Sequence, residues 1–156
     1  MKLKHGDRAP EFILSDQNGK KLKLSDFKGQ WVLLYFYPRD NTPGCSKEAC
    51  AFRDSFKEYE KIEAKVIGIS TDSVESHGKF VKKYQLPFPL LADEDKKVVE
   101  QYGVWGMKKF IGKEHMGTIR TSFLIDPKGN IAKIYEKVKP ADHAKEVLKD
   151  LREIGA

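Results

Sequence analysis

Apolar residues along the chain follow two patterns, continuous runs and helical repeats. Two continuous, β-prone runs, 31–37 and 65–70, are typical of central strands that are covered on both faces. The segment between them begins with a polar loop and then carries apolar residues at helical spacing: Ala49, Phe52, Phe56, Tyr59 and Ile62. This spacing predicts a helix after the loop, so the order is strand, helix, strand.

The flanking segments extend this order in both directions. On the N-terminal side, 12–14 and 21–24 surround Asn18-Gly19, a strong hairpin-turn signal, and 25–29 is one helical turn closed by glycine. Towards the C-terminus the patterns predict helices near 74–84, 96–102 and 142–154, a short apolar segment at 90–92, and a hairpin of 121–125 and 131–135. The sequence therefore predicts an α/β protein with the thioredoxin-like order, a mixed central β-sheet with helices on both faces and an N-terminal β-hairpin extension.

Length and composition narrow the possible classes. At 156 residues the chain has the length of one domain, and no repeat, linker or low-complexity tract divides residues 1–156. No apolar run approaches the roughly 18 residues that cross a bilayer, and the N-terminal residues lack the apolar core of a signal peptide. We expect a cytoplasmic protein with no membrane segment, and a monomer, because no long exposed apolar stripe is left over.

The formal net charge of +6 does not indicate nucleic-acid binding. Only five of the 29 basic residues are arginine, and acidic residues are interleaved with the lysines almost everywhere. Proteins that read phosphates and bases favour arginine and clustered basic stripes. A solvated lysine-rich surface is the better interpretation, so nucleic acid is not an expected partner.

The distinctive chemistry lies between residues 38 and 50, in the loop that leaves the first central strand. Loops at the carboxyl ends of strands carry the ligand sites of open α/β sheets. Thr42 is a favoured N-cap and Pro43 a favoured first helical residue, so Cys45 falls in the first turn of the next helix. Unpaired backbone N–H groups and the positive end of the helix dipole favour a thiolate there. Cys45 is therefore the candidate nucleophile.

Thiolate formation alone does not explain a fast reaction. Lowering the pKa of a thiol from about 8.5 to about 6 raises its ionised fraction roughly thirtyfold, but intrinsic nucleophilicity falls roughly tenfold. Groups that polarise the reacting bond must supply the rest. The candidates are the backbone N–H of Cys45, the hydroxyl of Thr42 and the guanidinium of Arg120, which precedes the strand 121–125. A surface salt bridge is the alternative role for Arg120.

The second cysteine, Cys50, lies five residues after Cys45. If both were helical, their Cα atoms would be ~8.5 Å apart, beyond the ~7 Å limit for a disulfide. A disulfide between them therefore requires the first helical turn to unwind, which couples oxidation to local unfolding. Cysteine is also common as an inert buried residue, and this alternative is stronger for Cys50 than for Cys45.

The segment around Cys45 resembles that of a known family. The pattern Pro38-x-x-x-Thr42-x-x-Cys45 is similar to the active-site signature of peroxiredoxins. The longer run Asp40-Asn41-Thr42-Pro43-Gly44-Cys45, followed by Glu48-Ala49-Cys50, resembles their Q-type subgroup, also called bacterioferritin comigratory proteins. The resemblance covers essentially the whole chain, including 6–12 and 120–126, with two mild departures: Ser46 stands where Thr is usual, and Arg39 where Lys is usual.

The resemblance implies a thiol-dependent peroxidase acting on hydrogen peroxide and organic hydroperoxides. It implies that Cys45 is the peroxidatic cysteine, which becomes a sulfenic acid, and that Cys50 resolves it as an intramolecular disulfide. It further implies that Thr42 and Arg120 bind the peroxide and shape the transition state, while Pro38 shields the thiolate from solvent. Thioredoxin or a similar dithiol protein is the implied electron donor, and no metal, flavin or haem is expected.

Two rival functions stay open. A disulfide oxidoreductase acting on proteins prefers Cys-x-x-Cys, which needs no unwinding, whereas the spacing here is Cys-x4-Cys. A redox sensor or chaperone-like binding protein would react once and not turn over. The mixed apolar and basic segment 105–111 is either its partner surface or, as we prefer, a loop packed over the active site. The scattered histidines are interpreted as surface residues that form no zinc site with the cysteines: His5, His77, His115 and His143.

Overall fold

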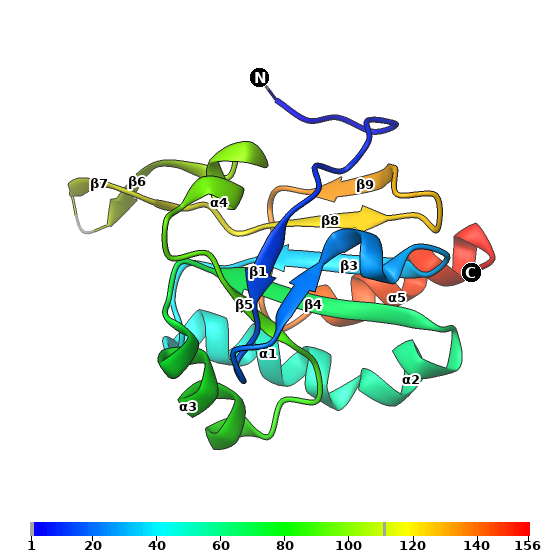
Figure 1. The fold of residues 1–156 in the computed structure, drawn as a ribbon, viewed down its shortest axis with the longest axis horizontal. Helices are drawn as coiled ribbons and strands as arrows, with labels where there is room; N and C mark the ends of the chain where they lie inside the picture. The colour runs from blue at the N-terminus through cyan, green and yellow to red at the C-terminus, as the bar shows by residue number, and fades with distance from the viewer. Residues whose placement is uncertain (1, 111) are drawn as a thin grey trace.

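A seven-stranded mixed sheet organises the chain, which a computed structural model describes for residues 2–110 and 112–156 (Figure 1). Its strand order is β2-β1-β5-β4-β3-β8-β9, and β3, β4 and β5 are parallel while the other pairs are antiparallel. The strands are β1 (Ile13–Ser15), β2 (Lys21–Lys23), β3 (Trp31–Phe36), β4 (Ala64–Ser70), β5 (Leu90–Ala92), β8 (Thr121–Ile125) and β9 (Ile131–Tyr135). The predicted N-terminal hairpin is β1–β2, and it extends one edge of the sheet.

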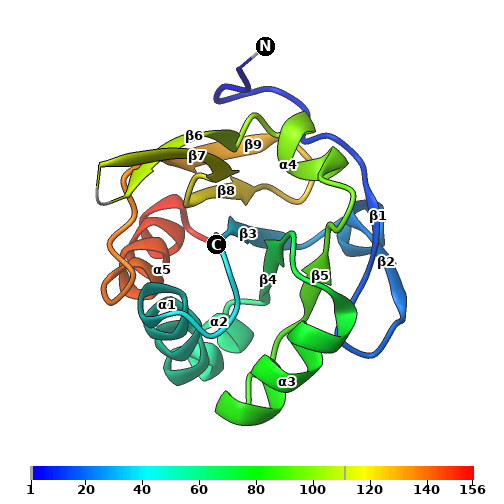
Figure 2. The same ribbon diagram turned by 90° about the vertical axis from the view of Figure 1, so that its left-hand side faces the viewer.

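Helices cover both faces of this sheet, as the fold prediction required, but unequally (Figure 2). One face packs against α1 (Pro43–Asp54), α2 (Phe56–Lys61), α3 (Val74–Tyr84) and α5 (His143–Ile154). The other face packs against α4 (Lys97–Gln101), the N-terminal segment and the short 3₁₀ helix η1 (Leu24–Phe27). The mixed sheet with helices on both faces confirms the predicted α/β class.

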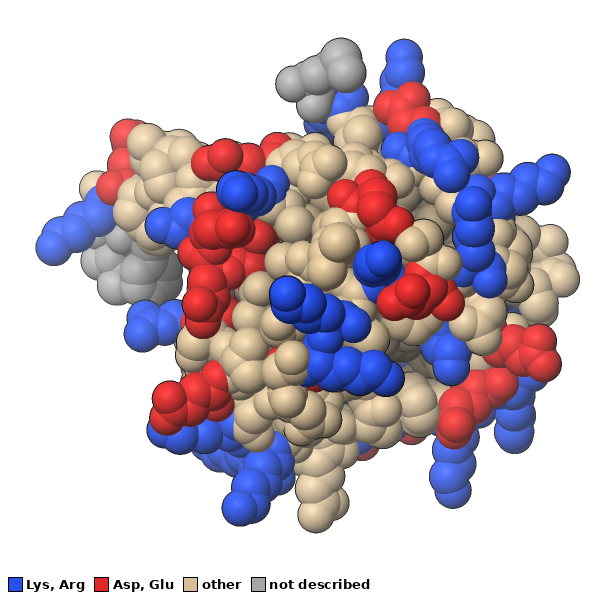
Figure 3. Space-filling view, viewed as in Figure 1, with Lys and Arg blue, Asp and Glu red and all other residues tan. Residues whose placement is uncertain are grey.

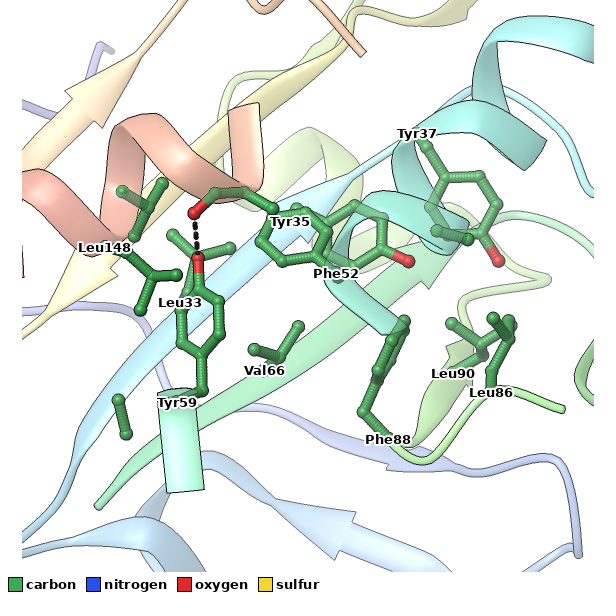
Figure 4. Close-up of a cluster of buried hydrophobic side chains, with 14 of the residues drawn as sticks. Leu33, Tyr35, Tyr37, Phe52, Tyr59, Val66, Leu86, Phe88, Leu90 and Leu148 are labelled. Atoms are coloured by element: carbon green, nitrogen blue, oxygen red, sulfur yellow. Dashed lines mark hydrogen bonds between the residues drawn. The ribbon is translucent and has the colours of Figure 1, made fainter. Parts of the chain in front are cut away.

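The two apolar layers meet in β3, whose side chains alternate between them. Leu33, Tyr35 and, directly after the strand, Tyr37 point into the layer beneath α1 and α5, where Figure 4 shows them among other buried aromatic and aliphatic side chains. Val32, Leu34 and Phe36 point into the opposite layer. Full burial of a side chain of this size stabilises a fold by about 1.5–3 kcal/mol. β3 is therefore firmly held, and the loop that follows it starts from a fixed point.

The structure differs from the sequence prediction at two segments. The helical spacing through 49–62 belongs to two helices, because Ser55 (φ −99°, ψ 2°) ends α1 and precedes α2. The segment 105–111 is not a loop: β6 (Trp105–Phe110) pairs with β7 (Lys113–Thr118) in a separate two-stranded sheet that projects from the body in Figure 1. The last residue of that segment, Ile111, lies outside the described residues.

The interpretation of all four histidines as surface residues is wrong for two of them. His77 and His143 are fully buried, and both ring nitrogens of each make hydrogen bonds. These bonds compensate the cost of removing an imidazole from water. His5 and His115 are exposed.

The outer surface carries both signs of charge. On the face shown in Figure 3, lysine and arginine side chains are interspersed with aspartate and glutamate. Across the described part of the chain, no helix combines the length and the apolar character needed to cross a membrane.

Candidate active site

The site begins where β3 ends. The chain leaves Phe36, passes through residues 37–42 and enters α1, so that Cys45 lies in the first helical turn and is 2% exposed. Thr42 has the extended backbone of an N-cap (φ −101°, ψ 155°), and its carbonyl accepts a hydrogen bond from the Ser46 N–H at 2.8 Å. Its side chain does not cap the helix, because the hydroxyl donates to the Arg39 carbonyl at 2.9 Å.

The register of the sheet brings Arg120 to this helix start. Thr121 of β8 pairs with Phe36, the last residue of β3, so Arg120 emerges beside the loop. Its Nη2 donates to Cys45 Sγ at 3.3 Å and its Nη1 to Glu48 Oε1 at 2.6 Å. The Arg120 side chain is 19% exposed and that of Glu48 is fully buried, so the alternative of a surface salt bridge is wrong.

The charges of this site depend on burial and on one another. Burial raises the pKa of Glu48 to about 7, although the Arg120 guanidinium opposes the shift. For Arg120, burial lowers the pKa, but the negative charges of Glu48 and Cys45 outweigh it and raise that pKa above its usual value. The second oxygen of Glu48, Oε2, is buried and has no hydrogen-bond partner among the described residues. Arg120 therefore stays a cation and is shared between a carboxyl group and the sulfur.

Gly44 allows the close approach of Arg120 to the helix. A Cβ atom at position 44 would lie 3.1 Å from Arg120 Nη2, which is tighter than ordinary van der Waals contact. Pro38 is half-buried at the opposite end of the loop, directly after the buried Tyr37. The predicted residues Pro38, Thr42 and Cys45 thus lie on one loop and helix start.

The charges of the site also act on Lys108, a cation of the β6–β7 hairpin. Burial, followed by the positive charge of Arg120, lowers the pKa of Lys108, while the charge of Cys45 opposes that shift. Lys108 Nζ donates to the Thr118 carbonyl at 3.1 Å, and its side chain passes over Gly117. The sequence analysis singled out the segment 105–111, which contains Lys108, but did not name this lysine as a site residue.

Cys50 has different surroundings. It is half-buried on the same unbroken helix as Cys45, and both thiols are free. Within the described ranges, no group donates a hydrogen bond to the Cys50 sulfur, whereas Arg120 donates one to Cys45. The helix between them keeps the two sulfurs on different turns, as the spacing predicted.

Sequence reasoning also missed a buried polar cluster under the loop. Asp40 is 8% exposed and contacts His77, which is fully buried, and Asp72. One ligand-type atom of each lies within 4.8 Å of the others. The motif around Cys45 contains Asp40, but Asp72 follows β4 and His77 belongs to α3, and no local pattern in the sequence connects them.

Comparison with known proteins identifies the family of the chain. Residues 5–134 match the AhpC/TSA family, so the chain belongs to that family and is a peroxiredoxin, a thiol-dependent peroxidase. It is similar to peroxiredoxin Bcp of Bacillus subtilis (strain 168), with 47% identity over 155 residues that cover 99% of each protein. It is 49% identical to peroxiredoxin Bcp of Escherichia coli (strain K12) over 151 residues, 97% of each.

Solved structures give the same result. A PrxQ variant of Xylella fastidiosa superposes with a TM-score of 0.94 at 35% identity, covering 100% of this chain and 99% of that one. Bacterioferritin comigratory protein of Xanthomonas campestris superposes with a TM-score of 0.87 at 36% identity, over 93% of this chain and 92% of that one. The resemblance to Q-type peroxiredoxins and the thioredoxin-like fold are confirmed.

Proposed function

We propose that Cys45 is the peroxidatic cysteine and Cys50 the resolving cysteine of a peroxidase recycled by thioredoxin or a similar dithiol protein. The observation that carries the assignment is the 3.3 Å hydrogen bond from Arg120 to the sulfur of Cys45. A guanidinium at this distance stabilises negative charge both before and during the reaction. Cys50 is a free thiol on the same helix, so it can supply the second sulfur of a disulfide.

In the first step, the Cys45 thiolate attacks one peroxide oxygen. An S–O bond forms and the O–O bond breaks, so Cys45 becomes a sulfenic acid and the other oxygen leaves as an alkoxide or hydroxide that takes up a proton. Arg120, already beside the sulfur, faces the charge that develops on the leaving oxygen. Glu48 holds the other edge of the guanidinium and fixes its orientation.

Thr42 and Pro38 have supporting roles in this proposal. The Thr42 hydroxyl proton is engaged with the Arg39 carbonyl, so its oxygen is left to accept a hydrogen bond from the peroxide O–H. Pro38 is half-buried and has no backbone N–H, and its proposed role is to keep water from the thiolate.

In the second step, the Cys50 sulfur attacks the sulfenic sulfur, a disulfide forms and water leaves. Since both cysteines belong to one intact helix, the first turn of α1 must unwind before the sulfurs meet. A dithiol donor then reduces the disulfide by thiol exchange and becomes a disulfide itself. Refolding of the turn returns Cys45 to Arg120.

The proposal also includes the substrate class, the oligomeric state and the cellular compartment. Hydrogen peroxide and organic hydroperoxides share the O–O bond that the site polarises, and the similar bacterioferritin comigratory protein of Xanthomonas campestris has alkyl peroxide reduction activity. We propose that the chain acts as a one-domain monomer in the cytoplasm, without a nucleic-acid or membrane partner.

The test is peroxide consumption with thioredoxin, its reductase and NADPH. Wild type is expected to consume NADPH continuously, Cys45→Ser not at all, and Cys50→Ser for one turnover. Wild type that stops after one equivalent with several dithiol donors would indicate a sensor. A Cys45→Ser variant that still turns over would contradict the assignment of the nucleophile.

A further inference from the structure

A buried polar cluster, which the peroxidase steps above do not use, fastens the β3–α1 loop to the rest of the fold. We call it the loop clamp. It consists of Tyr37, Asp40, Ser70, Asp72, Ser76 and His77. Its members come from the loop, the end of β4, the residues just after β4, and α3, so it joins the loop to elements other than α1.

Asp40 is the centre of the clamp. Its Oδ1 accepts from the Tyr37 hydroxyl at 2.6 Å, and its Oδ2 contacts Ser76 Oγ at 2.8 Å and His77 Nδ1 at 2.7 Å. Its backbone N–H donates to Asp72 Oδ2 at 2.7 Å. Both the side chain and the main chain of this one loop residue are therefore held.

The proton positions around His77 follow from its second contact. His77 Nε2 lies 2.9 Å from the Leu91 carbonyl, which only accepts, so Nε2 carries a proton. The short contact between Nδ1 and Asp40 then also contains a proton, shared by an imidazole and a carboxyl group. Such charge-assisted hydrogen bonds are stronger than neutral ones, and this one connects the loop to β5 through His77.

A metal site is the alternative interpretation of this cluster. Asp40, Asp72 and His77 offer ligand atoms within 4.8 Å of one another. However, both Asp40 oxygens already take part in hydrogen bonds, and Asp72 Oδ2 accepts from Ser70 as well as from the loop. Both ring nitrogens of His77 also take part in hydrogen bonds, so an ion bound by this histidine would have to break one of them, and the cluster is satisfied as a hydrogen-bonded network.

We propose that Asp40 is a positioning residue that sets the balance between the folded first turn of α1, in which Cys45 attacks peroxide, and the unwound turn, in which Cys45 meets Cys50. The proposal rests on the roles given above to the two cysteines. Asp40 lies two residues before Thr42, whose carbonyl closes the first turn through Ser46. A loop held at Asp40 confines unwinding to the stretch that follows and returns Cys45 to Arg120.

The experiment measures two rates in single turnovers. The first is oxidation of Cys45 by peroxide in a Cys50→Ser background, and the second is formation of the Cys45–Cys50 disulfide in the otherwise native protein, each quenched and read by mass spectrometry. Asp40→Ala is expected to slow the first about tenfold, the effect of one lost buried hydrogen-bond partner, and to accelerate the second. Tyr37→Phe, which removes a single bond to Asp40, should shift both rates the same way by a smaller factor.

Asp40→Asn separates positioning from charge. An Asn side chain offers one acceptor to Tyr37 and two N–H donors to Ser76 and His77, so the clamp is rebuilt without the shared proton. Both rates are expected to lie closer to those of wild type than to those of Asp40→Ala, because neutral hydrogen bonds replace the charge-assisted one in part. If Asp40→Asn is as impaired as Asp40→Ala, the charge of Asp40 is the property that matters and the positioning role is wrong.

The matched control is Tyr59→Phe. Tyr59 is as deeply buried as Tyr37, and its hydroxyl donates a hydrogen bond of the same 2.6 Å length, to the Ala144 carbonyl of α5 (Figure 4). It should lose stability like Tyr37→Phe without moving either rate. Equal effects of the two variants on both rates would show that general stability, not the clamp, sets the balance.

A readout without peroxide keeps this inference separate from the proposed function. Amide hydrogen exchange at Ser46, whose N–H closes the first turn, is expected to speed up in Asp40→Ala and Tyr37→Phe but not in Tyr59→Phe. If wild-type Cys45 does not react with peroxide, the proposed function fails while the exchange rates still test the clamp. Unchanged exchange at Ser46 in Asp40→Ala would overturn it.

Discussion

Cys45 and Cys50 belong to the same helix, yet their surroundings have little in common. Cys45 is 2% exposed, lies in the first turn and accepts a hydrogen bond from Arg120. Cys50 is half-buried in the helix interior, where no described group hydrogen-bonds to its sulfur. The sulfur of Cys45 accepts a hydrogen bond from a charged group, and among the described residues the sulfur of Cys50 does not.

This contrast separates the requirements of the two steps. Attack on a peroxide needs a thiolate and donors that are already in place when the O–O bond breaks. In the proposed second step, the Cys50 thiolate meets the sulfenic sulfur only after the first turn unwinds, so donors fixed beside Cys50 in the folded helix would not be in place for that step. In the proposed mechanism, the first turn of α1 therefore carries the groups that assist attack on the peroxide and is also the part of the helix that unwinds.

The largest effect is expected from Arg120→Met, which removes the hydrogen-bond donor that distinguishes the surroundings of Cys45 from those of Cys50. The rate of Cys45 oxidation is expected to fall by about 10²–10³, the usual effect of losing a donor to a developing oxyanion. Stopped-flow measurement in a Cys50→Ser background gives this rate. The control is Arg53→Met, an arginine of α1 that binds the Tyr84 carbonyl. A comparable loss in the control would contradict a specific role for Arg120.

The second prediction concerns Glu48, which helps to orient Arg120. The pKa of Glu48 rises from 4.5 to about 7 in the folded protein, mainly through burial, so the folded state binds more protons than the unfolded state between these values. The free energy of unfolding is therefore highest below pH 4.5, where Glu48 is protonated in both states. It falls as the pH rises from 4.5 towards 7, because the unfolded state loses this proton first. Glutamine does not titrate, so the free energy of unfolding of Glu48→Gln is expected to rise relative to that of wild type by about 1–3 kcal/mol across this pH range. Urea unfolding at several pH values measures it, and a difference that does not vary with pH would contradict the shift.

Thr42→Val tests the acceptor proposed for the peroxide proton. The variant keeps the side-chain shape but loses the hydroxyl, and Cys45 oxidation is expected to slow about tenfold. Thr42→Ser restores the oxygen and should recover most of the rate. If Thr42→Ser is as slow as Thr42→Val, the side-chain methyl rather than the hydroxyl is responsible.

The smallest effect is expected from Gly44→Ala. The added Cβ would lie 3.1 Å from Arg120 Nη2, so the guanidinium must move by a few tenths of an ångström. The oxidation rate of Cys45 should fall a few-fold, because donor position matters at this scale, while disulfide formation is little changed. Alkylation of Cys50 serves as the internal control and should not change.

Much of this fold could be predicted from the sequence, because strong local patterns coincide with the final elements. The bounds of α3, β5, β8 and β9 equal the predicted 74–84, 90–92, 121–125 and 131–135. The β6–β7 hairpin could not be predicted, since it carries Met107 and Met116 on an exposed face and lysines beside them. Alternation of apolar and polar residues is absent there, so no strand signal exists.

The residues of the candidate site also fall into those that the sequence predicted and those that it did not. Cys45 and Thr42 lie in one local motif, and Arg120 could be singled out because arginine is scarce and this one precedes a strong strand. The buried position of His77 had no signal, because its partners come from the loop and from β5. Contacts between segments far apart in the chain depend on the sheet register, which local patterns do not encode.

The central claim is that Cys45 reacts first and Cys50 second, and one peptide map tests it most directly. The protein is mixed with one equivalent of hydrogen peroxide, blocked within milliseconds and digested. Wild type is predicted to yield the Cys45–Cys50 disulfide, and Cys50→Ser a sulfenic acid on Cys45 alone. Oxidation of Cys50 in the Cys45→Ser variant at the wild-type rate, or a disulfide only between molecules, would contradict the account.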